Sequence, residues 1–336
     1  MTPPPIASLE KLHEALQAAV ELELAIIPPY LCAWWTIRDG GSRPAHLVAE
    51  VAVDEMRHLA VAANTLVATG GQPDLRPPCS YPAQLRVGGE PAELSLLPFG
   101  DAFVEQARRL ERPAPVPEGL LTAPPPGVRL LAMGEHYGSV GAFYQAIVEG
   151  IERLVDERGE ACVFPGRGRT ERQCRWFGNQ DIAVPGAAAA LRHLDDLIVE
   201  GEGEVLGVCE SGSVAHYYRF EGMQQGREYR CGDAPGRPTG PSLPCPADVE
   251  VVPMVRDPRM GDYEPRPRLH RDAAAFNAAF TAVLGDLDAG FDGEPAKVTA
   301  AVGRMLQLRE AAGRVLRHPH PCGDGRAGPT FEKPPA

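Results

Sequence analysis

Two glutamates stand inside the apolar seams of the first two helical segments, and they constrain the fold more than any other feature. Over residues 8–38 apolar side chains recur at alternating spacings of three and four, which predicts the inward face of a helix in an antiparallel bundle. The residues of this seam are Leu9, Leu12, Leu16, Ala19, Glu23, Ile26 and Tyr30. Glu23 is therefore expected to project into the core.

The second helical segment, residues 44–70, repeats this arrangement. His58 follows Glu55 by three residues, and side chains at this spacing are neighbours on a helix surface. The resulting E-x-x-H motif is weak evidence when it stands alone, but here the glutamate lies inside an apolar seam. That seam comprises Val48, Ala52, Glu55, Leu59, Ala62 and Leu66.

Carboxylates that project into a core need partners. Burying an unpaired carboxylate costs several kcal/mol, so two of them in one core require protons, cations or metal ions. A metal ion is the most economical solution, and carboxylate oxygen with imidazole nitrogen suits iron or manganese. We therefore predict that Glu23, Glu55 and His58 bind iron, with manganese as the alternative metal.

Further ligands are expected from the helical pattern over residues 128–157. Glu135 lies on a face with small residues, which leave room for a ligand or a close helix. His136 is the rival, since it aligns with apolar positions and equally fits a hydrogen-bonded core histidine. The sequence leaves the choice between them open, and Glu135 is the predicted ligand.

Two later helical segments each offer one more candidate. Over 186–205, Glu202 shares a face with apolar residues and is predicted as a third seam carboxylate, whereas Glu200 is expected to face solvent. Over 214–225, His216 opens an apolar set, which is consistent with a metal ligand or with a capped core histidine. Both Glu202 and His216 are predicted ligands.

Pro28 and Pro29 follow Glu23 within a continuing helical pattern. Proline removes a backbone donor and clashes with the carbonyl four residues earlier, so the helix is expected to kink or end there. Trp34 and Trp35 come next, either as core filling or as the wall of an apolar pocket.

The expected fold is mainly α, a four-helix bundle with two additional C-terminal helices and long Pro/Gly-rich loops. Residues 1–225 are predicted to form the bundle with inserted loops, and 226–336 a Pro-rich loop plus a helical extension that packs on it. The remaining helical patterns cover 271–291 and 295–317, and proline-rich stretches cover 71–127, 158–185 and 226–269. A short hairpin is predicted around Gly88-Gly89, and a strand over 249–255.

Composition excludes several classes of function. The 336 residues carry a formal net charge of -12 and no cluster of Lys or Arg, which disfavours nucleic acid and anionic membranes as partners. No secretory signal pattern and no apolar run of about 18 residues is evident, so a cytoplasmic protein is expected. The eight cysteines include no CxxC pair, which argues against a zinc ribbon, and most are expected to be small buried or loop residues without disulfides.

Several sequence strings, in order, resemble the ferritin-like domain of the iminophenyl-pyruvate dimer synthases of violacein and indolocarbazole assembly. These strings are VELELAIIPPYLCA, VAVDEMRHLAVAANTLVATGGQP, HYGSVGAFYQAI, IVEGEGE, HYYRF and AGPTFE. The resemblance implies a ferritin-like four-helix core. The counterparts of the family's metal-site residues are Glu23, Glu55, His58, Glu202 and His216. Where the family often has a glutamate this chain has Ala142, so either Glu135 replaces it or the site binds fewer ions.

The functional hypothesis is a non-haem iron oxidoreductase with a mononuclear or dinuclear site that activates dioxygen or peroxide. The resemblance implies an amino-acid-derived small molecule as the substrate and a role in secondary metabolism. A homodimer is left open. The alternative is a non-catalytic ferritin-like metal-binding protein or helical interaction protein.

Overall fold

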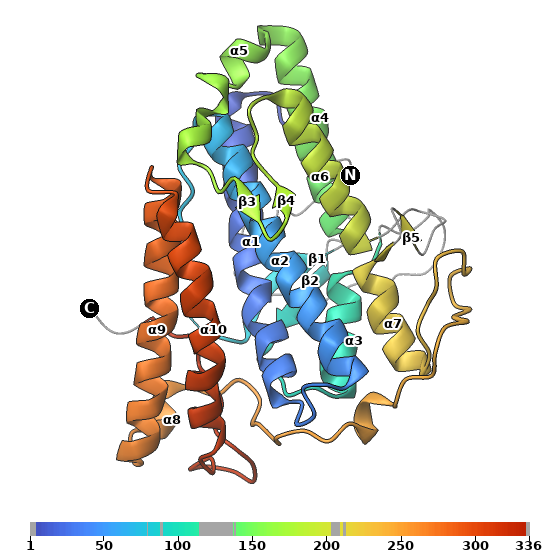
Figure 1. Ribbon diagram of the computed structural model, residues 1–336, viewed down its shortest axis with the longest axis vertical. Helices are drawn as coiled ribbons and strands as arrows, with labels where there is room; N and C mark the ends of the chain where they lie inside the picture. The colour runs from blue at the N-terminus through green and yellow to red at the C-terminus, as the bar shows by residue number, and fades with distance from the viewer. Residues whose placement is uncertain are drawn as a thin grey trace.

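Two long helices form the spine of the molecule. The computed structural model describes residues 5–78, 80–87, 90–113, 137, 139–202, 209–210 and 213–333. Helix α1 (Leu9–Thr36) and helix α2 (Arg43–Ala68) are joined by a short turn and pack along each other as an antiparallel pair (Figure 1). Their facing seams are buried, as their spacing of apolar residues predicts.

Shorter helices complete the bundle. Helix α4 (Val140–Arg158) packs on α6 (Ala187–Glu202) beside one half of the spine, and α3 (Asp101–Leu110) packs on α7 (His216–Gln225) beside the other half (Figure 1). The third and fourth positions of the bundle are thus each built from two helices. The ends of these helices meet near the middle of the spine. The centre of the bundle therefore contains helix ends on this side, and not a continuous helix.

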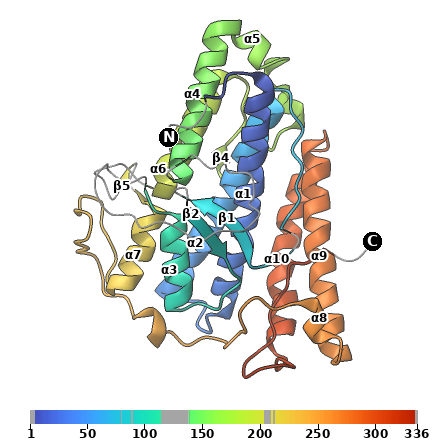
Figure 2. The ribbon, with the colours of Figure 1, turned by 180° about the vertical axis from the view of Figure 1, so that it is seen from behind.

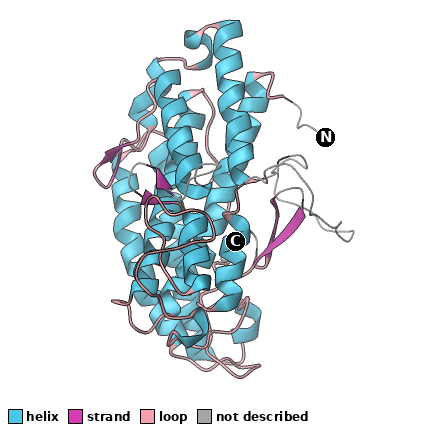
Figure 3. Ribbon diagram, turned by 90° about the vertical axis from the view of Figure 1, so that its right-hand side faces the viewer, coloured by secondary structure: helices cyan, strands magenta, loops and turns pink. Residues whose placement is uncertain are grey.

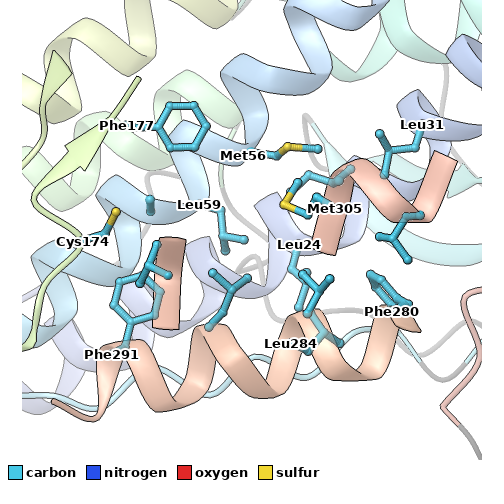
Figure 4. A pocket seen from close by; sticks show the side chains of 16 residues that line it. Leu24, Leu31, Met56, Leu59, Cys174, Phe177, Phe280, Leu284, Phe291 and Met305 are labelled. Carbon is cyan, nitrogen blue, oxygen red and sulfur yellow. The ribbon is translucent and has the colours of Figure 1, made fainter. Parts of the chain in front are cut away.

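A C-terminal hairpin covers the other side of the spine. Helices α9 (Pro267–Phe291) and α10 (Ala296–Leu316) pack on each other and against α1 and α2 (Figures 1 and 2). An apolar cavity of about 60 Å³ lies between the hairpin and the spine, lined by Leu24, Met56 and Leu59 among others (Figure 4). Trp35 is buried against Phe276 of this hairpin, so it serves as core filling.

The remaining elements are short and lie around the helices (Figure 3). In the described residues three antiparallel strand pairs occur, and they form no larger sheet. The pairs are β1 (Ala83–Val87) with β2 (Glu90–Leu94), β3 (Trp176–Phe177) with β4 (Gln180–Asp181), and β5 (Cys209–Glu210) with β6 (Ser213–Val214). The short helices are α5 (Glu160–Val163), α8 (Met260–Tyr263) and the 3₁₀ helices η1 (Arg167–Arg172) and η2 (Pro246–Asp248).

The mainly α architecture with two additional C-terminal helices confirms the sequence prediction, and the predicted hairpin around residues 88–89 is present as β1 and β2. Two details differ. Helix α3 lies within a stretch that its prolines led us to expect as loop. The predicted strand over 249–255 does not form, because this segment makes only isolated bridges, from Val251 to Ile37 and from Met254 to Arg326, instead of a continuous ladder.

Helix α1 continues through Pro28 and Pro29 to Thr36, so of the two expected outcomes, a kink or an end, the end does not occur. Pro29 cannot donate the amide hydrogen bond that the carbonyl of Ala25 would accept in a regular helix. The hydroxyl of Tyr81 donates to this carbonyl instead, at 2.7 Å. A side chain from the segment between α2 and β1 therefore satisfies the backbone acceptor that the proline leaves free.

By length and composition, α1 is the one helix among the described residues that could cross a membrane. Its most apolar window has a mean hydropathy of 1.3, and 83% of that window is buried inside the protein. The sequence pattern predicted no such segment. Burial accounts for the difference, because a core helix surrounded by other helices is apolar on most of its faces.

The cysteines depart from expectation at one position. Cys231 is disulfide-bonded, although the sequence predicted no disulfide. Among the described cysteines, those that are free are Cys32, Cys162, Cys174, Cys245 and Cys322.

The contact between Tyr81 and α1 yields a stability prediction. Tyr81→Phe should lower the free energy of unfolding by about 1–3 kcal/mol, because it leaves the buried carbonyl of Ala25 without a donor. In a Pro29→Ala background residue 29 regains its amide, so the same substitution should cost less. Urea denaturation of the four proteins of this cycle measures the coupling. An equal cost in both backgrounds would contradict the link.

Candidate metal centre

Three side chains of the spine meet at its centre. Glu23 comes from α1, and Glu55 and His58 come from the facing side of α2, where a spacing of three residues places them together. Each is at most 2% exposed. One ligand atom from each of the three lies within 4.8 Å of the others, so they form a first group that can hold a metal ion.

A second group of three shares Glu55 with the first. Glu111 directly follows α3, and His216 is the first residue of α7. Their ligand atoms and one from Glu55 again lie within 4.8 Å of one another, and both residues are buried. The second group therefore comes from the ends of the short helices that meet at the middle of the spine.

Several polar atoms at this centre are buried without a hydrogen-bond partner. They are Oε2 of Glu23, and Oε1 of Glu55 with Nδ1 of His216, which face each other without the geometry of a hydrogen bond. Buried polar atoms in proteins are normally paired, so a set of unpaired ones that face the same space fits a site that can bind a cation. His216 Nδ1 lies 3.0 Å from Glu55 Oε1 and 3.7 Å from Oε2 of Glu111. Three carboxylates and two imidazoles are a donor set that suits iron or manganese.

The two histidines are oriented alike. His58 directs Nδ1 toward Glu55 Oε2 at 3.3 Å, and its Nε2 lies 3.2 Å from Glu200 Oε2. His216 directs Nδ1 toward the shared glutamate and pairs its Nε2 with Asp54 Oδ2 at 3.1 Å. A metal-binding histidine usually donates its other ring N–H to a carboxylate, which fixes the ring and its tautomer. Both histidines have this arrangement.

Each outer carboxylate is held by an arginine. Arg57 forms an ion pair with Glu200, and Arg219 lies 3.4 Å from Asp54. The side chain of Glu200 is only 29% exposed and contacts His58, so the expectation that Glu200 faces solvent is wrong. The reason is tertiary: α6 packs against α2 and carries this carboxylate to the histidine.

Burial and neighbouring charges set the protonation of these ligands. Burial raises the pKa of Glu23 well above its ordinary value, and the neighbouring Glu55 carboxylate raises it further. For His58, burial lowers the pKa to about 3, so its imidazole is neutral and able to bind a metal. Burial alone would also lower the pKa of His216, but the nearby carboxylates of Asp54, Glu111 and Glu55 outweigh this effect and raise it well above its ordinary value.

The structure brings together four of the six predicted ligands: Glu23, Glu55, His58 and His216. Glu202 is the last residue of α6, and its side chain lies outside the described part of the structure. Glu135, like its rival His136, lies outside the described residues.

Sequence reasoning missed Glu111. A signal was present, because the four apolar residues just before it are spaced as on one face of a helix. These buried residues are Phe103, Val104, Ala107 and Leu110.

Metal binding should release protons. Metals bind ionised carboxylates and neutral imidazoles, so an incoming ion must displace the protons that raised pKa values keep on Glu23 and His216. Protons compete more strongly as the pH falls, and affinity should therefore drop below about pH 6. Calorimetric titration with Mn²⁺ in buffers of different ionisation enthalpy counts the protons released. Constant affinity and no proton release between about pH 5 and 7 would contradict this ligand set.

Comparisons with known proteins agree with the bundle. A family model described as Ferritin-like matches residues 16–225. The chain is 27% identical over 257 residues to dichlorochromopyrrolate synthase from Lentzea aerocolonigenes, a match that covers 64% of this chain and 24% of that enzyme. The chain thus spans about a quarter of the length of this curated relative.

The crystal structure of a ferritin like protein from Caulobacter vibrioides has the same fold. It superposes with a TM-score of 0.61 at 22% sequence identity, covering 92% of this chain and 98% of that one. These matches confirm the resemblance drawn from the sequence strings. With its helical bundle and a family model that covers more than half of its residues, the chain belongs to the ferritin-like family.

Proposed function

We propose that this protein is a metal-dependent oxidoreductase with a dinuclear non-haem iron centre. The observation that carries the proposal is the pair of buried ligand groups that share Glu55 and leave three polar atoms orphaned. The sequence leaves mononuclear and dinuclear sites open, and the two overlapping groups favour the dinuclear one. Manganese is the second candidate metal, because it prefers the same ligands.

In this proposal Glu23 and His58 would hold one ion, Glu111 and His216 would hold the other, and Glu55 would serve both. Its Oε2 faces His58 and its Oε1 faces His216, so each oxygen is directed to a different half of the site. Two divalent cations would offset three carboxylates that are otherwise buried close together. Without cations, such a cluster has to hold protons, which the raised pKa of Glu23 reflects.

The walls of the site suit a reaction that must be kept from water. The cavity beside the ligands is about 20 Å³, and it is bounded by apolar side chains of α1, α4 and α6, namely Ile26, Val140, Leu197 and Ile198. Gly141 and Gly201 also line it, and a Cβ on Gly201 would lie 3.6 Å from Glu111 Oε2. Iron bound here would supply electron transfer and activation of dioxygen or peroxide.

The substrate class proposed is an amino-acid-derived small molecule, in secondary metabolism. Support comes from the similarity to dichlorochromopyrrolate synthase and from the sequence strings that resemble iminophenyl-pyruvate dimer synthases. A cytoplasmic location is proposed with it. The net charge of -12 is consistent with a small molecule rather than nucleic acid as the partner.

The alternative is a ferritin-like metal-binding protein without catalytic activity. Metal content alone does not separate it from an enzyme, because both bind ions. Oxygen consumption that depends on an added substrate does separate them.

The test is anaerobic reconstitution with Fe²⁺, followed by oxygen uptake in the presence of aromatic amino acids and of the imino acids derived from them. We expect two iron ions per chain and substrate-dependent oxygen uptake. Because Glu55 serves both halves, Glu55→Gln should lower the affinity for both iron ions, whereas Glu23→Gln should mainly lower the affinity for one. Each of these affinities should fall at least about 10-fold, because mutation of a residue that only hydrogen-bonds a metal ligand already costs about this much.

Asp272→Asn is the matched control, because Asp272 pairs with His318 at 2.7 Å outside both ligand groups. This variant should bind both ions as the wild type does. Two bound ions without substrate-dependent oxygen uptake would favour the non-catalytic alternative. Less than about 0.2 equivalents of any transition metal in the wild type would contradict the metal site itself.

A further inference from the structure

Two buried tyrosines contact Glu23 and Glu111, the two glutamates that each belong to only one ligand group, in the same way. The hydroxyl of Tyr144, on α4, donates to Oε1 of Glu23 at 2.5 Å. The hydroxyl of Tyr30, on α1, donates to Oε1 of Glu111. Both tyrosines are at most 1% exposed. Each half of the centre therefore has one glutamate whose Oε1 is already engaged by a phenol.

The second oxygen of each glutamate is directed to the metal-binding space. Oε2 of Glu23 is buried and makes no hydrogen bond, and Oε2 of Glu111 lies 3.7 Å from the orphaned Nδ1 of His216. A carboxylate can bind a metal through one or both oxygens. With Oε1 held by a strong hydrogen bond, Oε2 is the oxygen left for the metal.

The tyrosines are fixed by their surroundings, and their hydrogen bonds cross between helices. Tyr30 is stacked on Phe220 of α7, with ring centres 5.7 Å apart, and meets Phe103 of α3 edge-on at 5.9 Å. Tyr144 packs against Phe143 at 5.9 Å. Buried rings in such contacts cannot turn away without opening the core, so the hydroxyl positions are set by packing.

We propose that Tyr30 and Tyr144 are positioning residues that restrict Glu111 and Glu23 to binding metal through one oxygen each. The proposal rests on the dinuclear centre of the proposed function. If Glu23 or Glu111 binds through one oxygen, it occupies a single coordination position on its ion. This would leave more of each ion's coordination sphere for substrate or oxidant than a glutamate bound through both oxygens would leave.

The test uses Co²⁺ as the probe, because its visible absorption bands weaken as its coordination number rises. The variants are Tyr30→Phe and Tyr144→Phe, which remove only a hydroxyl. Each should lower the affinity for one of the two Co²⁺ ions by about 10–100-fold, as expected for a group that orients a ligand. Each should also weaken the visible bands, because the released carboxylate can bind with both oxygens.

Tyr81→Phe is the matched control, because Tyr81 is also buried and its hydroxyl donates to a backbone carbonyl of α1 rather than to a glutamate. It should keep both Co²⁺ affinities and the spectrum of the wild type. A cycle with Glu23→Gln adds specificity: Tyr144 acts through Glu23, so Tyr144→Phe should reduce the affinity for the ion beside Glu23 and His58 less in this background than in the wild type.

A measurement on the wild type needs no variant to fold. Infrared difference spectra of the Co²⁺-loaded protein report how far the two carboxylate stretching bands are separated, which distinguishes binding through one oxygen from binding through two. We expect bands of the one-oxygen type. Their absence, or unchanged affinities and spectra in both tyrosine variants, would overturn the proposal. Fewer than two Co²⁺ ions in the wild type would instead count against the dinuclear centre.

Discussion

The arrangement of the bundle depends on the burial of three carboxylates at one point. Glu23, Glu55 and Glu111 are buried, and Glu23 and Glu111 each have a ligand atom within 4.8 Å of one on Glu55, where like charges repel and water cannot screen them. The free energy of this cluster is acceptable only if protons or cations neutralise it. The orphaned oxygens, the two histidines directed at Glu55 and the outer carboxylates that hold those histidines all fit neutralisation by cations.

The interruption of two helices makes this cluster possible. A continuous helix directs about one residue per turn at a given point. Where two helices end close together, the residue after one helix and the first residue of the other can both be directed at that point. Glu111 follows the end of α3, and His216 begins α7. The spine of α1 and α2 supplies the rigid half of the site, and the ends of the shorter helices supply the other half and the small cavity beside it.

The sequence predicts the half of the site that lies on regular helices. Glu23, Glu55 and His58 follow from helical periodicity, because the period alone tells which residues face the core. His216 could be predicted only as one of two alternatives, since a first-turn histidine also fits a core role. Glu111 could not be placed, because its position depends on where α3 ends relative to α2, and this is set by packing between segments far apart in sequence. Ala142 brings no carboxylate to the centre, and α4 contributes the hydroxyl of Tyr144 there.

The most direct test of this account is anomalous diffraction from crystals of the metal-loaded protein, measured at the absorption edge of the bound metal. The account predicts two anomalous peaks on either side of the Glu55 carboxylate, one beside Glu23 and His58 and the other beside Glu111 and His216. A single peak, or peaks away from Glu55, would contradict a dinuclear centre built on a shared glutamate.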